Sequence, residues 1–163
     1  MTAGEAVLRE VRPLLRISSV LLNVRETLPR PDWVVHFFHG PQNLDIVRTS
    51  PMLMRFVQTG NVRLRRYTID ERPVEEKNVD HRSYQNYHKT LKFWRLFSAP
   101  QLLLFEVDAV MCPEPQKPLS HFAEYAFVGA PCGPYPDGKL PSWCHNLAHC
   151  VGNSGFSLWR RDV

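Results

Sequence analysis

The feature that most constrains the fold is an unbroken apolar run at residues 102–105, which leads directly into Glu106 and Asp108. A run of this kind is typical of a strand buried on both faces, as in a parallel sheet. In open α/β sheets, ligands bind just beyond the carboxyl ends of such strands. Alternate residues of a strand point to the same side, so we expect the two carboxylates to converge on one Mg²⁺ or Mn²⁺ ion that carries a phosphate. Acidic residues also occur where a strand simply returns to water, and that interpretation stays open.

Helix-like and strand-like patterns alternate before this run. Proline, glycine and serine separate them, and Ser50-Pro51 is expected to cap and restart a helix. The β-α-β-α-β-α-β order predicts a Rossmann-like, mostly parallel sheet flanked by helices. The predicted strands cover residues 6–11, 33–38, 62–67 (near the sheet edge) and 102–105, and the predicted helices cover residues 14–28, 44–57 and 83–97. We expect a loop at 70–79, a helical turn at 120–124, a strand at 126–129, a long loop at 129–142, and a tight turn at 152–155 before a last strand.

Length and composition indicate one globular domain over residues 1–163, with 44% hydrophobic and 22% charged residues. No apolar run approaches the roughly 18–20 residues that span a bilayer. The first residues show neither the basic nor the apolar region of a secretory signal. We therefore expect no membrane span and a cytoplasmic location.

The formal net charge of +4 suits an anionic ligand such as a nucleotide diphosphate, and it also suits RNA. Arginines cluster at Arg63, Arg65 and Arg66 and again near the N-terminus. No basic run is long or regularly interleaved with aromatic residues. Nucleic acid is therefore not expected as the partner.

Two cysteines and two histidines lie close together at Cys144, His145, His149 and Cys150. Zinc accepts such ligands, but four ligands this close in sequence rarely close a tetrahedron. A Cys144–Cys150 disulfide would require an oxidising compartment. Buried free thiols are the favoured interpretation, and the role of the cluster stays open.

Six sequence blocks, in order, connect the chain to a known family. It resembles an uncharacterised domain family regarded as glycosyltransferase-like, with the GT-A nucleotide-sugar fold. The blocks are residues 6–8 through Arg12-Pro13, residues 38–40 with Asn43, residues 84–94, residues 102–108, residues 125–131 and residues 152–158.

The resemblance implies roles for matching residues. Asp108 would hold Mn²⁺ or Mg²⁺ against the diphosphate of the donor, and Arg12 would contact the base or phosphate. Glu106 stands where this family commonly has glutamine, so it would lie beside the metal rather than bind it directly. Gly152, Asn153 and Gly155 would lie beside the donor sugar and the acceptor. Each role has a structural alternative, such as a surface arginine at position 12 or a simple turn at the glycines.

These observations predict a GT-A-like domain that binds a nucleotide sugar through a divalent metal and transfers the sugar to an unknown acceptor. The alternatives are a degenerate, non-catalytic binding module and, third, a basic nucleic-acid-binding domain. Enzymes of this fold usually continue beyond the last strand, whereas this sequence stops at Val163. It is therefore C-terminally short, either as a fragment or as a domain that has lost part of its site. Neither a catalytic base nor the stereochemical course can be read from the sequence.

Overall fold

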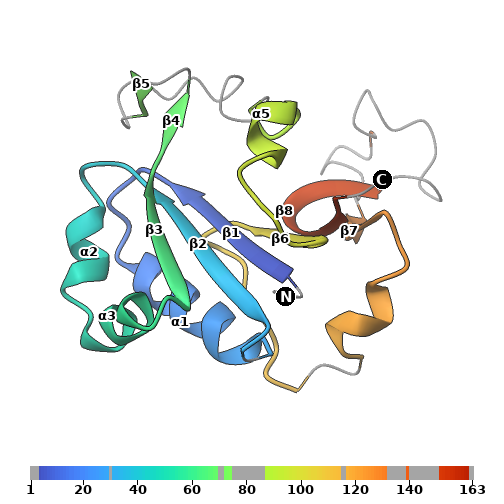
Figure 1. The fold of residues 1–163 in the computed structure, drawn as a ribbon, viewed down its shortest axis with the longest axis horizontal. Coiled ribbons are helices and arrows are strands. Elements are labelled where there is room, and N and C mark those ends of the chain that lie inside the picture. Colours follow the sequence, from blue (N-terminus) through green and yellow to red (C-terminus); the bar gives the residue numbers. More distant parts are fainter. Residues whose placement is uncertain are drawn as a thin grey trace.

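The computed structural model describes residues 4–29, 31–69, 72–74, 87–114, 117–131, 139 and 151–161. Its centre is a six-stranded sheet in the order β3-β2-β1-β6-β8-β7 (Figure 1). The neighbouring pairs β3–β2, β2–β1 and β1–β6 are parallel, and β8 runs antiparallel to both β6 and β7. The strands are β1 (Gly4–Glu10), β2 (Trp33–His39), β3 (Val62–Arg66), β6 (Gln101–Phe105), β7 (Phe127–Pro131) and β8 (Val151–Arg160). The predicted mostly parallel α/β architecture is confirmed.

Helices cover both faces of the sheet. The side chains of α1, α2 and α3 share one apolar cluster with one face, and α5 packs on the other (Figure 1). The helices are α1 (Arg16–Thr27), α2 (Leu44–Arg48), α3 (Pro51–Gln58), α5 (Leu91–Trp94) and the 3₁₀ turn η2 (Leu119–Phe122). As predicted, Ser50 caps α3 through its hydroxyl, and Pro51 occupies the first turn.

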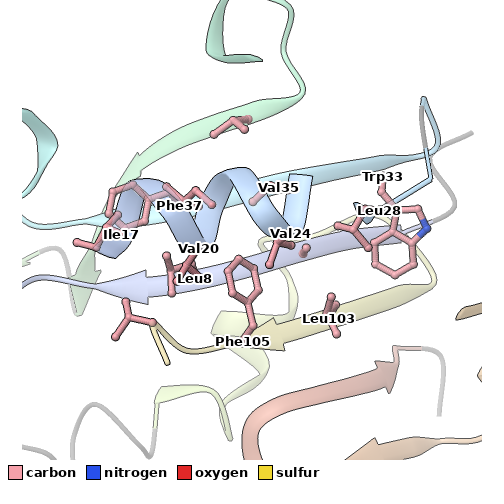
Figure 2. Close-up of a cluster of buried hydrophobic side chains, with 14 of the residues drawn as sticks. Leu8, Ile17, Val20, Val24, Leu28, Trp33, Val35, Phe37, Leu103 and Phe105 are labelled. Atoms are coloured by element: carbon pink, nitrogen blue, oxygen red, sulfur yellow. The ribbon is translucent and has the colours of Figure 1, made fainter. Parts of the chain in front are cut away.

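The strand that the sequence places at the centre of the sheet is buried on both faces. Leu103 and Phe105 of β6 join the cluster beneath α1, which Figure 2 shows with Leu8 and Phe37. Leu102 and Leu104 join the cluster beneath α5. The apolar residues at positions 102–105 of β6 therefore follow from its place between β1 and β8.

Gly4 opens β1 where the indole of Trp33 lies against the backbone. A Cβ added at Gly4 would meet Trp33 ring atoms at 2.4 Å. The close approach lets the indole close the end of the α1-side cluster, so a side chain at position 4 would displace it.

A buried ionisable pair joins β1 to β2 on the α5 side. The side chain of Glu5 is 4% exposed and that of His36 is 0% exposed, and the distance between Glu5 Oε1 and His36 Nε2 is 3.1 Å. The backbone N–H groups of Ser98 and Ala99 donate to Glu5 Oε2 at 2.9 and 3.0 Å. Burial raises the pKa of Glu5, but the hydrogen bonds from His36, Ala99 and Ser98 outweigh it and lower that pKa to about 2.

Burial lowers the pKa of His36 more than Glu5 raises it, so the imidazole is neutral and donates from Nε2. His36 Nδ1 is buried and finds no hydrogen-bond partner among the described residues. The pair is therefore a neutral histidine that donates to an ionised carboxylate, and it links β1, β2 and the segment before β6.

Three local predictions are wrong. In the described part of the predicted helix at 83–97, residues 88–90 are non-helical, because Thr90 caps α5 anew through its hydroxyl. In the predicted loop at 70–79, β5 (Arg72–Pro73) pairs with β4 (Thr68–Ile69). The predicted tight turn at 152–155 is part of the strand β8.

Among the described residues, no helix has the length and apolar character needed to cross a membrane.

Candidate functional site

The acidic pair lies just beyond the carboxyl end of β6, as predicted, but not on the strand itself. The strand ends at Phe105, and the carbonyl of Glu106 accepts a hydrogen bond from Ala109 N at 3.1 Å, which closes a turn. Within this turn Val107 is buried, whereas Glu106 and Asp108 are exposed. The expectation that both carboxylates lie on one face of a pleated strand is therefore wrong, because a turn now sets their directions.

The two carboxylates are nevertheless close enough to repel each other. Partial burial and, next, the negative charge of Asp108 raise the pKa of Glu106, while the charges of Arg9 and Arg12 oppose this rise. The pair therefore offers hard carboxylate oxygen atoms, which is the ligand chemistry that Mg²⁺ and Mn²⁺ take.

Arg12 lies at the same edge of the sheet, in the segment after β1. Glu10 Oε1 accepts from Arg12 Nε at 2.9 Å and from Arg12 N at 2.8 Å, and Glu10 Oε2 accepts from Arg12 Nη2 at 2.6 Å. The carboxylate of Glu10 is buried, whereas half of the Arg12 side chain is exposed. This two-pronged ion pair fixes the direction of the guanidinium.

Asn43 holds the segments after β1 and β2 together. Its Nδ2 donates to the carbonyls of Glu10 at 2.6 Å and Arg12 at 3.2 Å. Its Oδ1 accepts from Gly40 N at 3.0 Å. The side chain of Asn43 is fully buried, so the backbone around Arg12 is fixed from within the protein.

The glycine-containing block of the last strand reaches the acidic turn through one backbone contact. Glu106 N donates to the carbonyl of Gly155 at 2.8 Å. Because β8 runs antiparallel to β6 and Phe156 pairs with Phe105, the residues before Phe156 extend past the carboxyl end of β6. The structure thus brings Gly155 to Glu106 and places the backbones of Gly152 and Asn153 further along the same strand, which is strongly curved (Figure 1).

Two charged residues at this edge are not singled out by the sequence prediction. Glu10 ends β1 and orients Arg12, and Arg9 is the residue before it. The sequence signal that could have found them is the charged pair Arg9-Glu10, which directly follows the apolar residues 6–8. Charged side chains at the carboxyl end of a buried parallel strand lie where ligands bind in open α/β sheets.

The predicted cysteine–histidine cluster at Cys144, His145, His149 and Cys150 lies outside the described residues. Within the described ranges, no group of three or more His, Cys, Asp or Glu side chains could hold a metal ion. An ion at the acidic turn would therefore take part of its coordination from a bound phosphate and water, as Mg²⁺ commonly does.

The mostly parallel α/β fold is similar to that of a solved mannosyltransferase. A mannosyltransferase from Pyrobaculum calidifontis, PcManGT, solved in complex with GDP-Man and Mn²⁺, matches 98% of this chain with a TM-score of 0.56 and 11% sequence identity. The chain spans 45% of the length of that protein. At this identity the likeness establishes the fold alone.

The chain belongs to the family described as Protein of unknown function (DUF5672), whose model matches residues 68–163. The matched region includes the acidic turn and β8, and it begins after Arg12. No curated protein matches the sequence.

Proposed function

We propose that this chain binds a nucleotide sugar through a divalent metal at Asp108 and transfers the sugar to an acceptor. The observation that carries the proposal is the acidic pair Glu106 and Asp108, which follows the central strand of a GT-A-like sheet. The mannosyltransferase of similar fold binds GDP-Man and Mn²⁺, which supports the same ligand class here.

The residues present fit Mn²⁺ or Mg²⁺. The charge of Asp108 raises the pKa of Glu106, and a divalent cation beside the two carboxylates would offset this repulsion. We assign the metal to Asp108 and place Glu106 beside it, where Glu106 N is already held by Gly155. When bound, the metal would stabilise the negative charge that develops on the departing nucleoside diphosphate.

The remaining site residues would position the donor. Arg12, held by Glu10, would present its exposed guanidinium to the base or a phosphate of the nucleotide. Gly152, Asn153 and Gly155 would line the side of the donor sugar, because their strand continues past the acidic turn. The acceptor stays unassigned.

The nucleic-acid alternative receives less support from the basic strand β3. Arg65 lies over the rings of Phe38 and Phe97, with its Cζ 5.7 and 6.0 Å from their centroids, and donates to Leu96 O at 3.3 Å. This arginine therefore packs on the protein, which reduces the positive charge that β3 can offer to a phosphate backbone.

The test is a thermal-shift panel of nucleotide sugars and nucleoside diphosphates, each with and without Mn²⁺. We expect at least one ligand to raise Tm only with Mn²⁺, by an amount that corresponds to about 2.7 kcal/mol at a hundredfold excess over Kd. Asp108→Asn should remove the shift. The matched control is Asp45→Asn, which removes an exposed carboxylate from α2 and should leave the shift intact.

A panel with no metal-dependent shift in the wild type would contradict the proposal. A shift without sugar transfer to any acceptor would favour the degenerate binding module. RNA binding that falls steeply with salt and ignores Mn²⁺ would favour the third function.

A further inference from the structure

The side chain of Arg9 occupies a cluster on the α5 side of β1. Its Nη2 lies 3.4 Å from His88 Nδ1, and its Cζ lies 5.4 Å from the centroid of the Phe93 ring. It also lies close to the hydroxyl of Tyr67: burial raises the pKa of Tyr67, and the charge of Arg9 opposes the rise. Aromatic and imidazole groups thus fix a half-buried guanidinium at the penultimate position of a central strand.

Arg9 and Glu106 each follow the last paired residues of β1 and β6. Leu8 pairs with Phe105, so both residues lie at the carboxyl ends of these adjacent strands. The charge of Arg9 also opposes the rise in the pKa of Glu106, which places the guanidinium within electrostatic reach of the acidic turn. Arg12, in the segment after β1, is held by Glu10 through its Nε and Nη2 atoms.

His88 adds a hydrogen-bond donor of fixed position. Burial, then the charges of Arg9 and Lys89, lower the pKa of His88 to about 4, so the imidazole is neutral at neutral pH. Arginine can only donate, so we assign His88 Nδ1 as the acceptor and place the proton on Nε2. Arg9 and His88 therefore together offer N–H donors and one positive charge.

We propose that Arg9 and His88 form an anion subsite, beside the acidic turn, that binds a phosphate group of the donor diphosphate. The inference rests on the proposed function, because it names the side chains that would hold the same ligand opposite the metal. The planar, multiply donating guanidinium matches the geometry of phosphate oxygens. A fixed cation also stabilises the leaving diphosphate without being carried in by the ligand.

The test uses inorganic pyrophosphate without metal, in the presence of a chelator. We expect pyrophosphate to raise Tm. We also expect it to raise the pKa of His88 by roughly one unit, because it neutralises the neighbouring charge of Arg9. NMR of the histidine side chains measures this pKa. His88→Gln identifies the resonance. This measurement on the wild type needs no Arg9 variant to fold.

The variants then separate binding from structure. Arg9→Gln should weaken pyrophosphate binding at least tenfold, Arg9→Lys should weaken it less, and the matched control Arg55→Gln, on the exposed side of α3, should leave it unchanged. Asp108→Asn should retain metal-free binding, because the subsite does not include that carboxylate. Circular dichroism checks that each variant is folded.

The subsite is contradicted if pyrophosphate does not bind, if folded Arg9→Gln binds it as the wild type does, or if it binds without moving the pKa of His88. The proposed function can fail separately. If Mn²⁺ strengthens the binding of no nucleotide while pyrophosphate still binds in an Arg9-dependent way, metal-dependent sugar transfer is overturned and the subsite is supported.

Discussion

Two acidic centres lie along the same pair of adjacent strands, and their carboxylates are in opposite situations. Glu5, near the start of β1, receives hydrogen bonds from His36, Ser98 and Ala99, and its pKa is lowered to about 2. Glu106, beyond the end of β6, faces Asp108 and has a raised pKa. The carboxylate of the first centre is satisfied within the protein and serves stability. Under the proposed function, a bound cation would offset the repulsion in the second centre.

The largest expected effect comes from removing the satisfied carboxylate. Glu5→Leu should destabilise the protein by about 3–5 kcal/mol, because it leaves His36 and two backbone N–H groups buried without their acceptor. Denaturant unfolding measures this loss. Glu5→Gln keeps an acceptor oxygen and should lose less. A loss below about 1 kcal/mol in Glu5→Leu would show that the centre is not structural.

The next effect is a pH dependence that belongs to the Glu5 centre. The folded-state pKa of Glu5 lies below its ordinary value of 4.5, so its contribution is present above pH 4.5 and is lost as the pH falls towards 2. The lowered pKa of His36 acts in the same direction and begins below its ordinary value of 6.5. Together they predict a fall of about 3 kcal/mol or more between pH 6.5 and 2, measured as Tm against pH. Glu5→Gln should flatten the acid limb, and an unchanged curve would refute the assignment.

Asp108→Asn should behave oppositely to the Glu5 variants. Without ligand, it should change the free energy of unfolding by less than about 0.5 kcal/mol, because Asp108 is exposed. Chemical denaturation of the metal-free protein provides the comparison. A loss of more than about 1 kcal/mol would place Asp108 in the structural group.

The smallest effect tests the repulsion itself. Glu106→Gln should raise the stability of the ligand-free protein by a few tenths of a kcal/mol, because it removes a charge that Asp108 disfavours. The gain should shrink in 1 M salt, where exposed charges are screened over about 3 Å. Destabilisation that is independent of salt would point to a packing role for Glu106 instead.

The sequence predicts the centre of the fold well, because burial there leaves little choice of residue. An apolar side chain at every position from 102 to 105 is typical of a strand with two covered faces, and β6 indeed lies between β1 and β8. The start of α3 at Ser50-Pro51 is equally local, because the Ser50 hydroxyl caps the helix and the proline ring fits its first turn. Features set by neighbouring residues are therefore readable from the sequence.

Features set by distant partners are not. The direction of Glu106 depends on where β6 ends and on the carbonyl of Gly155, which a strand periodicity does not contain. The role of Glu10 depends on Arg12 and on the backbone fixed by Asn43. The helix predicted at 83–97 from its aromatic periodicity is interrupted at Thr90, because the Thr90 hydroxyl accepts from Phe93 N and starts a new helix there. In each case, a contact with a distant or capping residue determines a feature that the local sequence pattern does not predict.

The hydrogen bonds of Glu5 also order the events of folding. Its contact with His36 joins residues 31 apart, whereas its contact with Ala99 joins residues 94 apart. Closing the longer loop costs about 1 kcal/mol more in chain entropy, and long-range pairing slows folding. We therefore expect β1 and β2 to pair before β6 inserts beside them. The acidic turn, carried by β6, would then reach its place only after β1 and β2 have paired, so the candidate site would not be among the first parts of the sheet to form.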